Sequence, residues 1–325
     1  MHVKLSDYLT RILVKYFNYN KVIVTVREME KTQSLSILGS GVVGTIIGQG
    51  FLKLGYKVVF FDIDKLKVKE LCNNGFDATT SLKKAVVKSA VSFVCVPTPT
   101  KRGKIDLRYI KKVTMDLGTC VGRKSCYHLI VVKSTVTPTT TENIIIPLLE
   151  KYSSKKVGND IGVCVNPEFL TEIHSSWTSD ESFSRGFFNE PVIVIGEYDK
   201  RSGDFLQALY EPLKLPIVRT NLRTAEMIKY ALNCALATKI SYWNEIFYIC
   251  QLLDIDSDLV AQTVAKDVRI GRYGAVHGKA FGGKCLPKDL RAFIDFASSL
   301  GYDAKLLKAV EEINLRIGAE KGVRE

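Results

Sequence analysis

The sequence predicts an α/β protein in which a doubly wound parallel sheet is followed by an all-helical region with one long central helix. Three observations support this prediction. Short β-branched runs alternate with helical patterns from Ser34 to about Asn221, a glycine-rich turn follows the first run, and residues 224–253 contain neither Pro nor Gly. Continuous apolar strands separated by helices are typical of a parallel sheet covered on both faces.

The predicted strands share a continuous run of β-branched and aromatic residues. They are SLSILG, KVVFFDID, VSFVCVP, LIVVKST, IGVCVNP and PVIVIG. Strands of this kind are buried on both faces, so they belong to the interior of one sheet. We expect residues 34–222 to form a domain around this sheet, preceded by residues 1–33, an extension of unknown role.

The remainder of the chain is predicted to be helical. Residues 224–253 predict a helix of roughly 45 Å at 1.5 Å per residue. Thr224 is the expected N-cap, and Glu226 is expected in the first turn, where the helix dipole favours an anion. Further helices are expected at 256–268, 287–300 and 303–318. We therefore assign a second, helical domain to residues 223–325.

Composition excludes several classes of protein. The chain has 325 residues, with 46 Lys+Arg against 34 Asp+Glu, and its formal net charge is +12. Its 46% hydrophobic and 25% charged residues are typical of a globular protein with about two domains. No apolar run reaches the roughly 20 residues of a membrane-spanning helix. We therefore expect no binding to membranes. No RRM, KH or zinc-finger signature accompanies the lysines, so we expect no binding to nucleic acid either.

The excess of positive charge indicates the kind of ligand that the protein binds, and the cysteines indicate its redox compartment. A positively charged cleft would attract anionic nucleotides, and a general affinity for polyanions is the alternative. None of the eight cysteines forms a CxxC pair or a Cys/His metal-ligand spacing, and Cys95, Cys164 and Cys250 lie inside apolar runs. We therefore expect a reducing, cytoplasmic compartment and no bound metal.

The glycine-rich turn predicts a dinucleotide site. It comprises Gly39, Ser40, Gly41, Val42, Val43 and Gly44. The first glycine permits the tight turn, the second lets the backbone approach a pyrophosphate, and the third allows close helix packing. The following helix offers its first N–H groups to the phosphates. A glycine turn in an unrelated α/β unit is the alternative.

Asp62 extends this prediction to the identity of the dinucleotide. It stands at the end of the second predicted strand. Its carboxylate would accept hydrogen bonds from both ribose hydroxyls and would repel a 2′-phosphate. The sequence therefore predicts a Rossmann-type domain that binds NAD rather than NADP.

Residues 278–289 are predicted to carry a nucleophile. Cys285 follows a glycine-rich turn and lies between Lys284 and the nearby Lys288. Pro287 suits the first turn of a helix that begins here. Cationic neighbours and a helix amino terminus lower the pKa of a thiol, so we expect Cys285 to be reactive. The other seven cysteines are interpreted as small packing residues.

The long helix is predicted to direct polar groups toward a cleft. Glu226, Lys229 and Asn233 are spaced three and four residues apart and share one helix face. A lysine and an asparagine supply a cation and a neutral donor, which stabilise a developing oxyanion. Residues 166–172, NPEFLTE, follow a buried-type strand, where ligands of open α/β sheets bind. A solvated charged face and a capped loop are the alternative interpretations.

Together these motifs resemble the UDP-glucose/GDP-mannose dehydrogenase family. The matching segments are GSGVVG with FDID, VPTPT, GKIDL, KSTV, NPEFLTE, TAEMIKYALNCALATKIS, DVRIG and FGGKCLPKD. They occur in the order typical of the family and cover about residues 34–318. Their combination is far more specific than any one of them.

The resemblance implies an NAD-dependent four-electron oxidation of a nucleotide sugar at C6. The alcohol is oxidised to an aldehyde, Cys285 adds to it, and a second oxidation leaves a thioester that water hydrolyses to the uronate. A cysteine suits this chemistry because it can hold an acyl group between oxidation and hydrolysis. UDP-glucose is the expected substrate, and GDP-mannose and UDP-N-acetylmannosamine are the alternatives. A catalytically weak NAD-binding dimerisation module is the alternative from another class.

The resemblance also implies a role for individual residues. Lys229 and Asn233 would stabilise the oxyanion, Glu168 would transfer a proton in hydrolysis, and Asp289 would hold or activate water. The expected cofactor contacts are residues 39–44, Asp62, Lys67, Pro97, Thr98, Thr135 and Glu172, of which Thr135 would also contact water. The expected substrate contacts are Glu168, Phe169, Leu170, Lys229, Asn233, Arg269, Phe281, Gly282 and Gly283. Arg269 would reach the substrate across a homodimer interface formed through residues 224–253.

Three features depart from the family pattern. The stretch between FDID and VPTPT is shorter than usual, and Thr137-Pro138-Thr139 replaces the common Pro-Pro-Gly. The chain stops at Glu325, before the family's third domain, which supplies much of the nucleotide pocket. We therefore expect either a fragment or a short protein that works with a partner or poorly.

Overall fold

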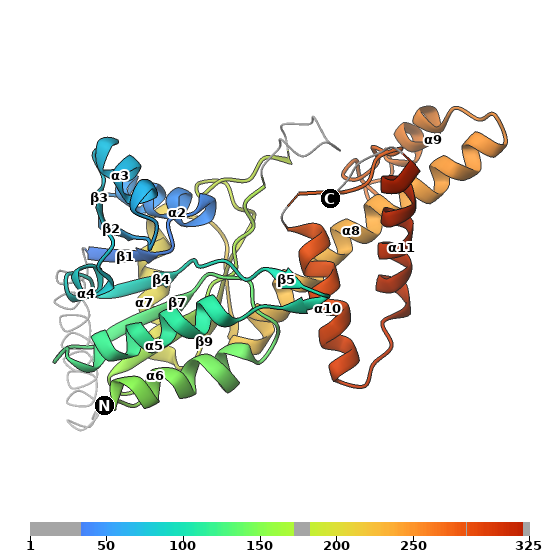
Figure 1. Ribbon diagram of the computed structural model, residues 1–325. Coiled ribbons are helices and arrows are strands. Elements are labelled where there is room, and N and C mark those ends of the chain that lie inside the picture. Colours follow the sequence, from blue (N-terminus) through green and yellow to red (C-terminus); the bar gives the residue numbers. More distant parts are fainter. Residues whose placement is uncertain (1–33, 172–182, 284, 321–325) are drawn as a thin grey trace, which may run out of the picture.

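The structure is a computed structural model that describes residues 34–171, 183–283 and 285–320 (Figure 1). An eight-stranded sheet carries helices on both faces, and a helical part follows it in the chain. This arrangement confirms the predicted fold class. The predicted extension, residues 1–33, lies outside the described residues, and so does Glu172. No described helix is both long and apolar enough to cross a membrane.

The main sheet contains more strands than the apolar runs predicted. Its strands are β1 (Ser34–Leu38), β2 (Lys57–Phe61), β3 (Asp77–Thr79), β4 (Val91–Val94), β7 (His128–Val132), β8 (Ile161–Val165), β9 (Ile193–Glu197) and β10 (Ile217–Asn221). Their spatial order is β10-β9-β8-β7-β4-β1-β2-β3. The separate antiparallel hairpin consists of β5 (Thr100–Lys101) and β6 (Lys104–Ile105). The unpredicted strands β3 and β10 lie at the two edges, where polar residues interrupt the apolar pattern.

One end of the sheet differs from the wholly parallel arrangement that the sequence predicts. Strands β1 to β4, β7 and β8 are parallel to one another, but β9 pairs with β8 in the antiparallel direction. Strand β10 is parallel to β9. An apolar run reports that a strand is buried and does not report its direction. As a result, the start of β9 lies at the same edge as the end of β8.

Helices cover both faces of the sheet and create two apolar cores. They are α2 (Val42–Lys53), α3 (Lys65–Asn73), α4 (Leu82–Val87), α5 (Arg108–Gly122), η1 (Thr141–Ile145), α6 (Ile146–Ser153), α7 (Lys200–Tyr210) and η3 (Glu211–Leu213). Successive residues of a strand point to opposite faces. Accordingly Ile37 belongs to the core that contains Phe51 of α2, and Leu38 to the core that contains Leu117 of α5.

The helical part is built on the long helix α8 (Leu222–Leu252). Helices α10 (Leu286–Ser299) and α11 (Lys305–Glu320) pack against it around Ile240, Leu290 and Val310. Figure 1 shows α8 extending from the sheet to the far end of this helical part, where α9 (Ser257–Val264) lies.

The boundaries of these helices correct several predictions. The N-cap of α8 is Asn221, whose Oδ1 accepts the Thr224 N–H at 2.8 Å, so the expectations of a Thr224 cap and of Glu226 in the first turn were wrong. An amide side chain at the end of β10 reaches the first turn and starts the helix early. The helix predicted over 256–268 spans only Ser257–Val264, and the last two helices are displaced by one or two residues.

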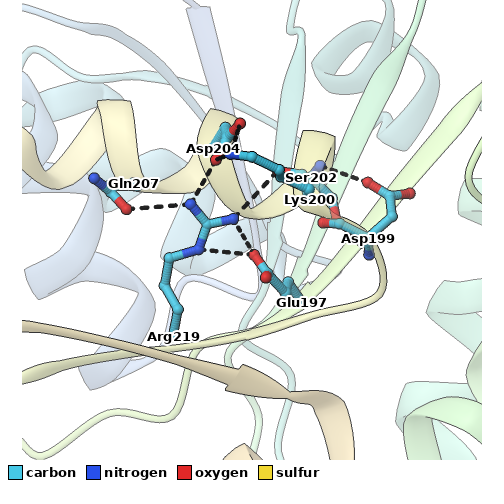
Figure 2. Close-up of polar contacts among 7 residues, drawn as sticks. All are labelled: Glu197, Asp199, Lys200, Ser202, Asp204, Gln207 and Arg219. Atoms are coloured by element: carbon cyan, nitrogen blue, oxygen red, sulfur yellow. Dashed lines mark hydrogen bonds and ion pairs between the residues drawn. The ribbon is translucent and has the colours of Figure 1, made fainter.

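A polar network fixes the edge strand β10 to its neighbours (Figure 2). Arg219 of β10 donates from Nε to Glu197 Oε2 of β9 at 2.9 Å and from Nη1 to Asp204 Oδ1 of α7 at 2.5 Å. Gln207 and the Lys200 carbonyl accept further hydrogen bonds from the same guanidinium. A charged network that spans three elements holds the outer strand in register.

Candidate active site

The glycine-rich turn joins β1 to α2 at the carboxyl edge of the sheet. Gly39 has φ of 98°, and a Cβ on Gly44 would lie 2.1 Å from the Gly39 carbonyl oxygen. A Cβ on Gly41 would meet nothing within 4 Å. The first and third glycines are therefore required by the backbone and by packing, whereas the second leaves the backbone open to a ligand. The N-cap residue Gly41 supplies no side-chain hydrogen bond to α2, which leaves the first turn suited to phosphate.

Asp62 lies directly beside this turn. Its Oδ2 accepts the Ser40 N–H at 2.8 Å, and its Oδ1 accepts the Asp64 N–H at 3.0 Å. Lys67 Nζ lies 3.9 Å from the same Oδ2. In the turn itself, Val42 is exposed and Val43 is half-buried. The carboxylate is thus oriented at the end of β2, where the ribose of a dinucleotide is bound in Rossmann-type domains.

The segments after β4 and β7 meet at the same edge. Thr98 Oγ1 donates to the Thr135 carbonyl at 2.6 Å, and Ser134 Oγ donates to the Val96 carbonyl at 2.7 Å. Pro97 is exposed and Thr135 is half-buried. The structure therefore brings Pro97, Thr98 and Thr135 to the edge that carries the glycine turn.

A buried ion pair connects the segment after β8 to the long helix. Lys229 Nζ donates to Glu168 Oε1 at 3.0 Å and to the Glu168 carbonyl at 2.6 Å. Both residues are buried, and the Leu170 N–H donates to Glu168 Oε2 at 2.9 Å. The Lys229 ammonium also lies 5.7 Å from the ring centroid of Phe169. Burial opposes the charged ammonium, but the adjacent Glu168 carboxylate raises the pKa of Lys229.

A second pair lies one turn further along α8. Asn233 Nδ2 donates to Asp289 Oδ2 at 2.6 Å, and Asp289 is 1% exposed. Lys288 contacts the other carboxylate oxygen of Asp289. The Asp289 N–H donates to the carbonyl of Cys285, the N-cap residue of α10. The structure thus brings Lys229, Asn233, Glu168, Asp289 and Cys285 together.

The thiol of Cys285 differs from the expectation of a lowered pKa. The residue is exposed, yet desolvation of the thiol and the negative charge of Glu168 raise its pKa. Lys229 and Lys288 act in the opposite direction and do not compensate for the burial of the thiol and for the two carboxylates, Glu168 and Asp289. The expectation was wrong because the sequence around Cys285 shows neither the burial of the thiol nor the approach of Glu168.

The remaining predicted substrate residues occupy two different places. Phe281 is buried and exchanges two hydrogen bonds with the Asn314 side chain, at 2.7 and 3.0 Å, which fixes the turn before Cys285. Gly282 and Gly283 continue this turn, and Gly283 has φ of 79°. Arg269 is 85% exposed at its side chain and pairs with Asp267 at 2.6 Å. Among the described residues of this chain, no contact joins Arg269 to the cluster around Cys285.

Comparison with known proteins decides the family. The NAD-binding domain of the UDP-glucose/GDP-mannose dehydrogenase family matches residues 72–214, and the family's central domain matches residues 223–316. The chain belongs to this family. It is an NAD-dependent oxidoreductase of the nucleotide-sugar 6-dehydrogenase type, and NAD is its cofactor.

Relatives with two different substrates in their names are similar to this chain. GDP-mannose 6-dehydrogenase of Pseudomonas savastanoi pv. phaseolicola is 39% identical over 304 residues, which are 86% of this chain and 67% of the relative. UDP-glucose 6-dehydrogenase of Haloferax volcanii is 37% identical over 306 residues, 86% of this chain and 69% of the relative. The solved UDP-glucose dehydrogenase of Pyrobaculum islandicum has a TM-score of 0.80 and 35% identity, over 88% of this chain and 68% of the other.

Two buried residues next to the cluster were not identified from the sequence. Lys133 directly follows β7 and donates from Nζ to Asn166 Oδ1 at 2.8 Å, and Glu190 precedes β9. Lys133 belongs to the KSTV segment, in which a role was predicted for Thr135 alone. Glu190 carries no sequence signal, since its position depends on the reversed direction of β9.

Proposed function

We propose that this dehydrogenase oxidises the C6 alcohol of a nucleotide sugar to the carboxylate, with Cys285 as the covalent nucleophile. The observation that supports this proposal is the cluster of Cys285, Lys229, Glu168, Asn233 and Asp289. It combines a thiol, two donors and two carboxylates. Glu168 follows β8 at the edge where the glycine turn follows β1, so substrate and cofactor would meet at this edge.

The residues of the turn fit NAD. Backbone N–H groups at the start of α2 would hold the pyrophosphate, and Asp62 would hold the ribose hydroxyls. Pro97, Thr98, Thr135 and Glu172 complete the proposed contacts. NAD supplies the hydride acceptor for each of the two oxidations.

The side chains of the cluster supply the remaining chemistry. Lys229 and Asn233 would donate to the sugar oxygen while negative charge develops on it. The Cys285 sulfur would form a bond to the aldehyde carbon, and the thiol proton would pass to the aldehyde oxygen. Loss of a hydride and a proton then leaves a thioester. Glu168 would take a proton from the attacking water, and Asp289 would hold that water, so that hydrolysis releases the uronate and restores the thiol.

We further propose UDP-glucose as the substrate, with UDP-glucuronate as the product. The 35% identity to the solved UDP-glucose dehydrogenase of Pyrobaculum islandicum and the 37% identity to the UDP-glucose 6-dehydrogenase of Haloferax volcanii support this choice. GDP-mannose stays the alternative, supported by the 39% identity to a GDP-mannose 6-dehydrogenase. The contacts of Phe169, Leu170, Phe281, Gly282, Gly283 and Arg269 with the sugar nucleotide belong to this proposal.

The test is NADH formation from NAD with UDP-glucose or GDP-mannose, combined with mass spectrometry of the sugar product. We expect two NADH per uronate from the preferred sugar. Cys285→Ala should lower uronate formation by about 10³-fold or more, because no thioester can form. Cys234→Ala, which changes a buried packing cysteine, is the matched control and should retain uronate formation. Unchanged uronate formation in Cys285→Ala would contradict the mechanism.

We also propose that the boundary between the two domains lies between residues 222 and 223. We further propose that two copies of the chain form a homodimer whose interface is made by residues 224–253. The family matches, which end at residue 214 and resume at residue 223, support the division. Exposed apolar side chains on the distal half of α8 support the dimer. They are Tyr242, Ile249 and Leu252, which are 51%, 49% and 85% exposed. In such a dimer Arg269 of one protomer would reach the substrate of the other.

A further inference from the structure

The segment that leads to Cys285 belongs to no helix or strand. Residues 278–281 lie between α9 and α10 and run past both α8 and α11. Backbone N–H and C=O groups that leave water need hydrogen-bond partners, because an unpaired buried group costs free energy. Asn244 of α8 and Asn314 of α11 supply such partners to this segment. We call these two side chains the asparagine clamp.

Each asparagine of the clamp both accepts a hydrogen bond from the segment and donates one to it. Asn244 Oδ1 accepts the Gly278 N–H at 2.9 Å, and its Nδ2 donates to the Lys279 carbonyl at 2.9 Å. Asn314 Oδ1 accepts the Phe281 N–H at 2.7 Å, and its Nδ2 donates to the Phe281 carbonyl at 3.0 Å. A side-chain amide has an acceptor and two donors, so it can pair with a main chain as a neighbouring strand would.

The clamp is attached to the packed interior of the helical part. Asn244 is completely buried, and Asn314 is half-buried. Phe281 is 2% exposed and belongs to the apolar core that contains Leu290 of α10 and Val310 of α11. Because well-packed side chains have little freedom to move, the four hydrogen bonds fix the segment against two helices at once.

The chain after Phe281 depends on this attachment. A Cβ on Gly282 or Gly283 would meet nothing within 4 Å, and Gly283 has φ of 79°. Glycine permits many backbone conformations, so these two residues do not themselves determine where Cys285 lies. On the other side of Cys285, its carbonyl accepts the Asp289 N–H at 2.9 Å within the first turn of α10. The sulfur is therefore placed by the clamp on one side and by α10 on the other.

We propose that Asn244 and Asn314 are positioning residues for Cys285, which hold the sulfur where it can bond to the aldehyde carbon. The inference rests on the proposed function, in which Cys285 is the nucleophile. Both asparagines act through the main chain of residues 278–281 rather than through substrate or cofactor. Asn314 lies on α11, a helix to which the proposed reaction assigns no chemistry.

Loss of the clamp should affect the two oxidations unequally. The first oxidation, from alcohol to aldehyde, needs NAD and no thiol, whereas the second needs the bond between the sulfur and the aldehyde carbon. A displacement of about 1 Å can lower the rate of such a step about a hundredfold. Variants without the clamp should therefore release free aldehyde after one NADH. A general loss of stability would lower both oxidations together.

The first test measures NADH and uronate in Asn244→Leu and Asn314→Leu, which remove the amide with little change of size. Uronate formation should fall about tenfold to a hundredfold, NADH per uronate should exceed two, and mass spectrometry should detect the aldehyde. Asn314→Asp keeps the acceptor for the Phe281 N–H and loses the donor, so it should lie between parent and Asn314→Leu. Asn73→Leu, at an exposed asparagine of α3, is the matched control and should keep the parent values. Two NADH per uronate in both clamp variants would overturn the inference.

The second test needs no turnover and separates this inference from the proposed function. Cys285 should be alkylated by iodoacetamide several-fold faster in both leucine variants, because the released segment takes the sulfur away from Glu168, whose charge raises the thiol pKa. Cys250, a cysteine of α8 that is 5% exposed, should keep its parent rate.

Each outcome of the second test has one meaning. A faster reaction confined to Cys285 would support the clamp even if no nucleotide sugar were oxidised, a result that would contradict the proposed function alone. An unchanged rate at Cys285 would overturn the inference. A parallel increase at Cys250 would also overturn it, because the asparagines would then stabilise the helical part as a whole.

Discussion

At the scale of single residues, the charge around Cys285 determines how the thiol behaves. Its pKa is raised by desolvation and by Glu168, so the thiol is protonated at neutral pH. In the proposed mechanism, the proton that leaves the sulfur as the sulfur bonds to the aldehyde carbon would pass to the aldehyde oxygen. The raised pKa keeps the free thiol slow to react with electrophiles in general, since the thiolate is the reactive species.

The first prediction concerns this thiol. Glu168→Gln removes the negative charge that raises the pKa of Cys285 and leaves Lys229 without its counter-ion. Alkylation of Cys285 by iodoacetamide near pH 8 should become several-fold faster, measured by peptide mass spectrometry. Cys285→Ala identifies the modified peptide. A slower reaction in Glu168→Gln would contradict the assigned electrostatics.

The second prediction concerns Asp62. Asp62→Ala removes the acceptor that we assign to the ribose hydroxyls and that also holds the Ser40 N–H at 2.8 Å. Hydrogen bonds to a charged group contribute about 1.5–3 kcal/mol, so the Kd for NAD should rise about tenfold to a hundredfold in calorimetry. Asp64→Ala, at the N-cap of α3, is the control and should change NAD affinity little. An unchanged Kd in Asp62→Ala would place the ribose elsewhere.

At the scale of elements, the junction between α8 and η1 contains a second perturbed carboxyl group. Glu226 is 2% exposed, and its Oε1 accepts the Thr141 N–H at 2.9 Å. Its Oε2 is buried without a hydrogen-bond partner. Desolvation raises the pKa of Glu226 to about 7, despite the hydrogen bonds from Thr141.

The third prediction follows from the sign of this shift. A carboxyl group whose folded-state pKa exceeds its unfolded value retains its proton in the folded chain, so stability falls as pH rises from about 4.5 to about 7. Glu226→Gln removes this contribution. Relative to the parent, the variant should gain about 2–3 kcal/mol between pH 5 and pH 8, visible as a higher relative Tm. Glu142→Gln, at a more exposed carboxylate nearby, is the control. A difference that is constant with pH would contradict this interpretation.

The elements also show how far the sequence alone could lead. The strands with continuous apolar runs, the glycine turn and the long helix were predictable because each has a local pattern. Strand β10 was not, since IVRTN is polar and half-exposed and depends on Arg219 for its attachment. The direction of β9 was not predictable either, because pairing between distant strands leaves no local signal.

The residues of the candidate site also divide into those that the sequence could predict and those that it could not. Cys285, Lys229, Asn233 and Glu168 were identified from motifs, and the structure brings them together. Glu190 could not be found, because its proximity to Glu168 results from the reversed strand. The pKa of the thiol could not be predicted either, since it depends on burial and on Glu168, which is distant in the chain.

At the scale of the whole molecule, exposed apolar residues lie at the end of α8 and on α9, in the part of the helical region that Figure 1 shows far from the sheet. Leu252 is 85% exposed, Leu253 63% and Leu259 62%. Large apolar side chains in one exposed region are typical of an interface between subunits.

The fourth prediction is that this region holds two protomers together. Leu252→Glu should convert the dimer into a monomer in light scattering, because a charge would be buried at the interface. Leu300→Glu, at a similarly exposed leucine beyond α10, is the control and should leave the mass unchanged. A parent chain that is monomeric at every concentration tested would contradict the proposed dimer.

The direct passage from β10 into α8 has a consequence for how this protein can change during evolution. Asn221 is both the last residue of the strand and the cap of the helix, so no linker separates them. One inserted residue between Asn221 and Lys229 would rotate every later side chain by about 100° around the helix axis. The lysine and the asparagine would then point away from the thiol. Surface loops can lengthen or shorten among descendants, whereas the eight-residue separation of Asn221 and Lys229 is fixed by the geometry of the helix.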